Sequence, residues 1–261
     1  MHDDAPRPTD TAPTDAALTA AALAAAIDAA GDPDDAAFLQ RFFKTGSGHY
    51  GEGDVFVGVR VPATRAIVKR FERMPLAEAV ALLASPVHEH RLAALLVMVR
   101  QAEVARRPRT RDDAGRLALH RAYLDAVRDG RVNNWDLVDS TAEVLVGEMV
   151  RDGIGDASLL DRLAASASLW ERRVAVIATF ADIRAGDAGP TLRLAAGLLD
   201  DREDLIQKAV GWMLREVGKR VDRDLLTGFL DEHAPRMPRT MLSYATELLT
   251  PAERAAYRAM R

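Results

Sequence analysis

The chain contains no cysteine among its 261 residues. Disulfides, thiolate metal sites and a cysteine nucleophile are therefore excluded, and the composition suits a reducing compartment. No apolar run approaches the roughly 20 residues that a membrane-spanning helix needs. The acidic start, residues 1–6, lacks the basic and apolar segments of a signal peptide. These absences predict a soluble, cytoplasmic protein that makes no contact with a membrane.

Motifs for metal, nucleotide and hydrolase chemistry are missing as well. The six histidines show no pair at metal-ligand spacing, and His88 and His90 would point to different sides of a helix. The glycines of residues 46–53 lack the preceding strand and the following Lys-Ser/Thr of a phosphate-binding loop. Neither GxSxG nor HExxH occurs. We therefore expect no metal and no small-molecule cofactor.

The net charge is small and unevenly distributed. A value of −4 argues against nucleic-acid binding at first, because phosphate contacts need Lys and Arg. Residues 1–35, however, carry eight Asp and one Arg, so their net charge is −7 and that of the remaining chain is +3. A mildly basic body permits DNA binding without requiring it.

A single domain is predicted from the arrangement of helical segments. Residues 1–14, rich in Pro, Asp and Thr, are expected to form a disordered acidic leader, and residues 15–261 one helical domain. An alanine-rich helix is predicted over 15–30, and Asp32 and Pro33 have the residue types of a helix N-cap and first position. A glycine-rich loop follows at 46–53. Apolar residues then recur with helical spacing in 63–72, 75–84, 86–104, 112–129, 134–151, 158–167, 170–185, 189–200, 203–219, 223–233 and 237–248.

Three of these helical segments resemble one another, namely 89–98, 171–180 and 206–215. The second and third are 35 residues apart, and the first lies about two further units of ~41 residues upstream. Helix pairs repeated at this period are typical of HEAT-like solenoids. The predicted fold is therefore all-α, a HEAT-like repeat solenoid of antiparallel helix pairs whose second helices form a concave binding face.

The three tryptophans stand on, or at the start of, these second helices. Each has a charged residue about one turn away on the same helix face: Trp135 with Asp139, Trp170 with Arg173, and Trp212 with both Lys208 and Arg215. A core tryptophan more often has apolar neighbours at these offsets. A structural interpretation stays open, because Asp136 and Asp139 are also favoured near a helix N-terminus that Asn134 would cap.

These segments resemble the AlkD family of alkylpurine DNA glycosylases, which are HEAT-like repeat proteins that remove 3-methyladenine and 7-methylguanine. The similarity covers about residues 36–260 and leaves out the acidic residues 1–35. One departure is Asn134, where some members have a second aromatic residue. The segments that carry the resemblance, in chain order, are 43–46, 50–54, 58–62, 134–139, 169–173 and 206–215.

The resemblance implies a DNA repair glycosylase that hydrolyses the N-glycosidic bond of cationic alkylated purines. Its partner would be duplex DNA, and we expect it to act as a monomer without a cofactor. The implied catalytic residues are Asp139, Trp135 and Trp212. The implied DNA-binding residues are Arg173, Arg215, Lys208 and Trp170.

Two other functions remain open, because some relatives of this fold have lost glycosylase activity. A non-catalytic HEAT-like module that binds DNA structures would have the same fold and the same basic face. A scaffold that contacts only proteins would leave the charged neighbours of the tryptophans unexplained. The presence together of Trp135, Asp139 and Trp212 favours the enzyme, since a binding module does not need this set.

Overall fold

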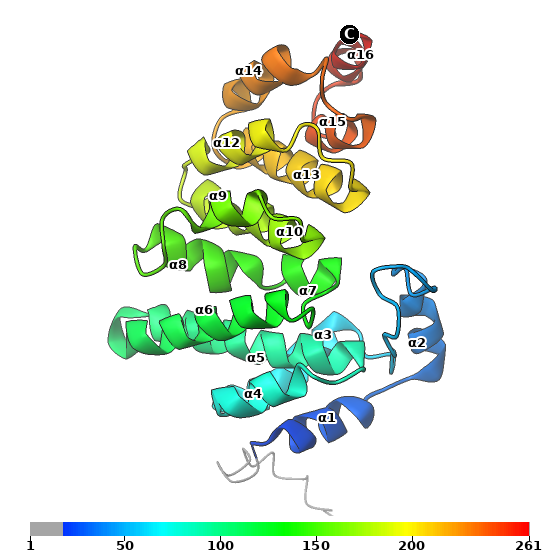
Figure 1. The fold of residues 1–261 in the computed structure, drawn as a ribbon, viewed down its shortest axis with the longest axis vertical. Coiled ribbons are helices and arrows are strands. Elements are labelled where there is room, and N and C mark those ends of the chain that lie inside the picture. The colour runs from blue at the N-terminus through cyan, green and yellow to red at the C-terminus, as the bar shows by residue number, and fades with distance from the viewer. Residues whose placement is uncertain (1–17, 261) are drawn as a thin grey trace, which may run out of the picture.

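The computed structural model describes residues 18–260, which form an all-helical solenoid as predicted. The helices are stacked along the long axis of the molecule, from α1 at the blue end to α16 at the red end (Figure 1). Within the described residues there is no strand; Val55 and Val87 form one isolated parallel bridge. None of the described helices is long and apolar enough to cross a membrane. The predicted leader, residues 1–14, lies outside the described part.

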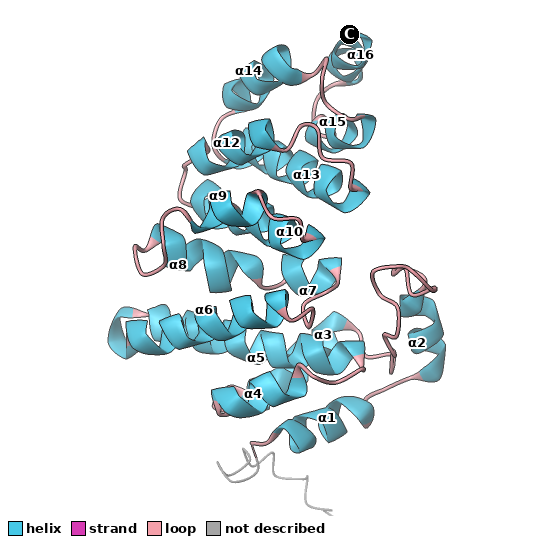
Figure 2. Cartoon of the chain, viewed as in Figure 1, coloured by secondary structure: helices cyan, strands magenta, loops and turns pink. Residues whose placement is uncertain are grey.

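The second helix begins where its cap residues predict, whereas the first is shorter than the predicted segment 15–30. The first helix, α1 (Ala20–Asp28), is capped by Thr19, and the second, α2 (Pro33–Gln40), begins at Pro33. The Asp32 side chain accepts hydrogen bonds from the backbone N–H groups of the next two Asp residues at 2.9 and 3.0 Å. The glycine-rich loop follows α2, and the two elements form a lobe beside the main stack (Figures 1 and 2).

Most of the predicted helices are confirmed with shifts of a few residues at their ends. The central ones are α3 (Val61–Val68), which continues into the 3-10 turn η2 (Lys69–Phe71), then α4 (Leu76–Leu82), α5 (His88–Arg106), the 3-10 turn η3 (Pro108–Thr110), α6 (Asp113–Arg128) and α9 (Leu159–Ala164). The C-terminal ones are α12 (Gly189–Gly197), α13 (Asp204–Arg220), α14 (Arg223–His233) and α15 (Arg239–Ala245).

The predicted continuous helix over 134–151 is wrong, because the structure divides it. It consists of α7 (Trp135–Asp139), the π-helical segment η4 (Glu143–Gly147) and α8 (Glu148–Arg151). The hydroxyl of Thr141 donates to the Leu137 carbonyl at 2.6 Å, a back-bond that bends helices. A Cβ on Gly147 would lie 2.0 Å from the carbonyl oxygen of Ala178, so this crossing of helices requires glycine. The chain after Asp139 thus makes a turn at Ser140 and Thr141 before the π-helical segment begins.

A second predicted helix is also divided, and one helix was not predicted. The segment 170–185 forms α10 (Leu169–Ala178) and α11 (Phe180–Arg184), which meet at Thr179. The last helix, α16 (Pro251–Ala259), begins with a capping box in which Thr250 and Glu253 bond reciprocally. The sequence Thr-x-x-Glu is the usual signal for such a start, so this helix could have been found.

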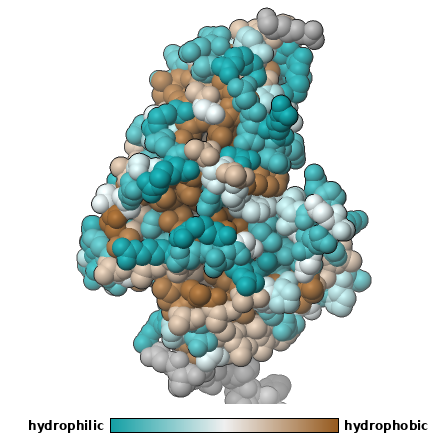
Figure 3. Space-filling view, in the orientation of Figure 1, coloured by the Kyte–Doolittle hydropathy of each residue, from teal (hydrophilic) through white to brown (hydrophobic). Residues whose placement is uncertain are grey.

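The core lies between the layers of helices. Helix α10 packs against α9 and against α13, and α13 packs in turn against α14 and α15. The three similar segments lie on α5, α10 and α13, and all three helices have buried apolar residues in these segments. On the face drawn in Figure 3, rows of hydrophilic side chains alternate with apolar bands, and a hollow separates the α2 lobe from the C-terminal helices. This hollow leads to the site described next.

Candidate functional site

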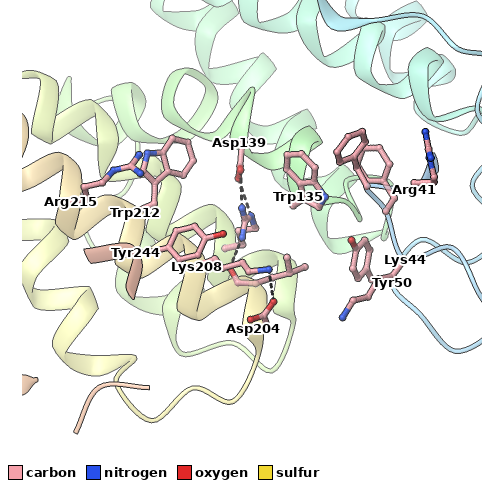
Figure 4. Close-up of a pocket in the computed structure, with 14 residues that line it drawn as sticks. Arg41, Lys44, Tyr50, Trp135, Asp139, Asp204, Lys208, Trp212, Arg215 and Tyr244 are labelled. Carbon is pink, nitrogen blue, oxygen red and sulfur yellow. Dashed lines mark hydrogen bonds and ion pairs between the residues drawn. The ribbon is translucent and has the colours of Figure 1, made fainter. Parts of the chain in front are cut away.

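A cleft of about 590 Å³ opens between the α2 lobe and the helices of the main stack. Helix α7 forms its floor, α10, α13 and α15 form one wall, and the segment after α2 forms the other. Figure 4 shows Trp135 and Asp139 between the two walls. The residues lining the cleft are Arg41, Phe42, Phe43, Lys44, Tyr50, Trp135, Asp139, Arg173, Asp204, Leu205, Lys208, Trp212, Arg215 and Tyr244.

The short helix α7 places one aromatic ring and one carboxylate on the floor of the cleft. Asn134 is its N-cap, as predicted, and accepts a hydrogen bond from the Trp135 N–H at 2.9 Å. Leu137 and Val138 are buried in the core. Because Trp135 and Asp139 are four residues apart, both lie on the opposite side of the helix, towards the cleft.

The carboxylate of Asp139 is held by a two-pronged ion pair. Arg173 on α10 donates from Nε to Oδ1 at 2.9 Å and from Nη2 to Oδ2 at 2.8 Å. The third nitrogen of this guanidinium, Nη1, donates to the carbonyl of Leu205. Burial raises the pKa of Asp139, and the positive charge of Arg173 opposes that rise. The pairing fixes the direction of the carboxylate and favours its charged form.

A second indole ring faces this carboxylate from α13. The Nε1–H of Trp212 donates to Glu216 at 3.3 Å, and the ring packs against Phe180 with the centroids 6.3 Å apart. Glu216 is itself buried and accepts from Arg220 at 2.6 Å. These contacts hold Trp212 in the wall beside Asp139 (Figure 4).

The other predicted cations of the cleft have acidic partners. Lys208 forms an ion pair with Asp204 at 2.7 Å, in which both side chains are partly exposed. Arg215 pairs with Glu247 and, at 3.1 Å, with Glu216. The pair of Lys208 and Asp204 is exposed enough to contribute little to stability, about 0–1 kcal/mol, so a phosphate group can replace that carboxylate at small cost.

The structure brings six of the predicted site residues to the cleft but leaves Trp170 outside its lining. Trp170 instead meets Tyr50 edge to face, with the ring centroids 5.6 Å apart. This contact joins the glycine-rich loop to α10. The roles predicted for these seven residues in catalysis and DNA binding stay predictions.

The wall formed after α2 was not predicted as part of the site. Phe43 stacks on Trp135, with centroids 5.3 Å apart and planes at 22°. Arg41, Phe42 and Lys44 line the cleft around it. Two adjacent phenylalanines in a chain with only 5% aromatic residues were the available signal. The sequence does not show that this segment faces α7, because that contact depends on how the α2 lobe folds back.

A buried ionic cluster fastens this wall to the floor. The imidazole of His88 lies 2.7 Å from Asp136 and 3.4 Å from Asp54, and Arg91 pairs with Asp54 at 2.5 Å. Although burial alone lowers it, the two carboxylates raise the pKa of His88 to about 9. The charged imidazole of His88 on α5 thus links two elements: the segment before α3, which carries Asp54, and helix α7, which carries Asp136. His88 and His90 do point to different partners, as predicted, since His90 bonds to Asp28 at 2.8 Å.

Comparison with known proteins points to one family. A family model described as DNA alkylation repair enzyme matches residues 23–249. Among solved structures, the fold is similar to a predicted DNA alkylation repair enzyme from Enterococcus faecalis, with a TM-score of 0.64. The two chains share 18% identity, and the match covers 85% of this chain and 97% of the other, a likeness that concerns the fold alone. A search of curated proteins finds no match.

Proposed function

The chain belongs to the DNA alkylation repair enzyme family, and on this premise we propose that it is a DNA glycosylase for alkylated purines. The proposed reaction is hydrolysis of the N-glycosidic bond of cationic bases, with 3-methyladenine and 7-methylguanine as the substrate class, in duplex DNA. The observation that carries the proposal is the paired carboxylate of Asp139 on the floor of a cleft between two indole rings.

The chemistry of the substrate explains why a carboxylate suffices. Alkylation at N3 or N7 leaves the purine positively charged, so the base departs without being protonated by an acid. The barrier lies in the positive charge that develops on the deoxyribose as the bond to C1′ breaks. A fixed negative charge near C1′ stabilises this charge and can orient the attacking water. We assign this role to Asp139.

Trp135 and Trp212 add to the same effect. The face of an indole ring attracts a cation, and the two rings line the cleft on either side of Asp139 (Figure 4). They also exclude water, which strengthens the interaction between the carboxylate and the developing charge. Arg173 acts through Asp139, because its ion pair keeps the carboxylate charged and aimed.

The DNA backbone would be held by the cations of the α13 wall. In this proposal, phosphate groups of the DNA replace Asp204 as the partner of Lys208 and Glu247 as the partner of Arg215. Contacts between cations and phosphates fix the register of the duplex on the protein. Arg173 and Trp170 stay in the proposed DNA-binding set, although Arg173 is buried and Trp170 lies beside Tyr50. In this scheme water is the nucleophile, so the reaction needs no nucleophilic side chain, metal or redox group, and we propose a monomer acting without a cofactor.

The proposal is tested by the products formed from methylated duplex DNA. We expect the protein to release free 3-methyladenine or 7-methylguanine and to leave one alkali-labile abasic site for each base released. Spontaneous release from the same DNA without protein is the control, because cationic purines also depart slowly by themselves. Binding of the duplex without any release above this control would contradict the glycosylase and would indicate a non-catalytic DNA-binding module instead.

A further inference from the structure

Phe42, on the α2 side of the cleft, is an apolar ring left largely in water. Its exposed fraction is 58%, although it lines the same cleft as Asp139. Phe38 packs against one edge of the ring, with the centroids 5.3 Å apart at 72°. Phe38 is itself 40% exposed, so the two rings form a contiguous apolar patch beside the cleft, and such patches mark binding surfaces. Phe42 has no part in the chemistry proposed above.

Two cations flank Phe42 and differ from those on the opposite wall. Arg41 and Lys44 both line the cleft, yet neither forms an ion pair within residues 18–260. Arg41 lies over the ring of Phe38 at 4.6 Å and leaves its charge without a carboxylate. By contrast, Lys208 and Arg215 are paired with acids. The positive charge of the cleft that has no acidic partner therefore lies on the wall formed by the segment after α2, which we call the α2 wall.

This wall is held firmly against the floor of the cleft. Phe43, directly after Phe42, stacks on Trp135, and Tyr50 contacts Trp170 on α10. Phe43 also packs against His88, with ring centroids 4.9 Å apart. A ligand that reaches Asp139 would consequently meet Phe42 and its flanking cations in a fixed position.

We propose that Arg41, Phe42 and Lys44 form a second nucleic-acid site, in which Phe42 stacks on an unpaired base and the two cations hold the adjoining phosphates. The two cations without carboxylate partners favour a ligand that carries several negative charges. The exposed ring of Phe42 favours a ligand that also has aromatic groups on which it can stack. Single-stranded or locally unpaired DNA meets both conditions, because its bases are free to stack on an aromatic side chain. This inference rests on the proposed function, in which DNA is the substrate. The site would give the protein a higher affinity for duplexes in which base stacking is already disturbed.

Equilibrium binding to two unmethylated duplexes, one fully paired and one with a single unpaired base, tests this site. We expect wild type to bind the second duplex more tightly, and Phe42→Ala to weaken that binding about five- to hundredfold. The slope of log Kd against log salt should not change in this variant, because no charge is removed. Phe42→Trp should retain the affinity. Lys44→Ala should weaken binding to both duplexes and reduce the slope by about one.

Leu248→Ala is the matched control, because Leu248 is 60% exposed and lies outside the cleft. We expect it to bind like wild type. Equal affinity of Phe42→Ala and wild type for the duplex with the unpaired base would overturn the stacking site. Since these measurements use binding alone, they remain informative if the protein releases no base. Conversely, if wild type releases methylated bases and Phe42→Ala binds the duplex with the unpaired base as tightly as wild type, the stacking site is rejected and the proposed glycosylase activity is not.

Discussion

Asp139→Asn should lower the single-turnover rate of base release about a hundredfold or more. The substitution keeps the size of the side chain and removes the negative charge that the proposed mechanism places near C1′. Duplex binding should be retained, because the change takes a negative charge away from a cleft that is to hold phosphates. The measurement is release of methylated purine at saturating protein, together with the dissociation constant for the same duplex.

Asp204→Asn is the matched control for this experiment. Asp204 lines the same cleft and is also paired with a cation, Lys208, but its side chain is 49% exposed. The same change of charge there should alter the rate only a few-fold, because water screens it. Equal losses in the two variants would mean that the general charge of the cleft, and not the position of Asp139, determines the rate.

Arg173→Met should destabilise the protein by about 3 kcal/mol at pH 7, because it leaves the largely buried carboxylate of Asp139 without its partner. The pKa of Asp139 is already raised by burial, and without the opposing charge of Arg173 it should rise further. A raised pKa in the folded state favours folding at low pH, where the carboxyl is protonated. The loss of stability relative to wild type should therefore be smaller at pH 5 than at pH 7.

The same substitution should shift the pH dependence of base release. Because the proposed mechanism needs the charged carboxylate, the acid limb of the rate profile should move to higher pH in Arg173→Met. The double variant with Asp139→Asn should be more stable at pH 7 than the single Arg173→Met variant, since the unpaired charge is gone. An unshifted profile, or a double variant no more stable than the single one, would show that Arg173 does not act through Asp139.

Residues on one helix were the part of the site that the sequence could predict. Trp135 and Asp139 share α7, and Lys208, Trp212 and Arg215 share α13, so helical spacing alone places each group on one face. The ion pair between Asp139 and Arg173 joins residues 34 positions apart, and its geometry depends on how α7 crosses α10. Helical spacing contains no information about such a crossing.

The positions of the α2 wall and of the π-helical segment after Asp139 also could not be predicted from helical spacing. The sequence indicated α2 and its loop, but not that Phe43 would stack on Trp135 from the opposite side of the cleft. Apolar periodicity over 134–151 continues through the π-helical turn, because the core is on the same side in both kinds of helix. The contacts that accompany the break, the Thr141 back-bond to Leu137 and the close approach of Gly147 to Ala178, become visible only in the folded chain.

Stabilisation of a cationic deoxyribose is tested most directly by affinity for a charged abasic-site analogue. One duplex carries a positively charged pyrrolidine in place of the sugar, and the other carries the neutral tetrahydrofuran of the same shape. We expect wild type to bind the charged analogue at least about tenfold more tightly, a difference of about 1.4 kcal/mol, and Asp139→Asn to lose this preference. Equal affinity of wild type for the two duplexes would contradict the proposed mechanism.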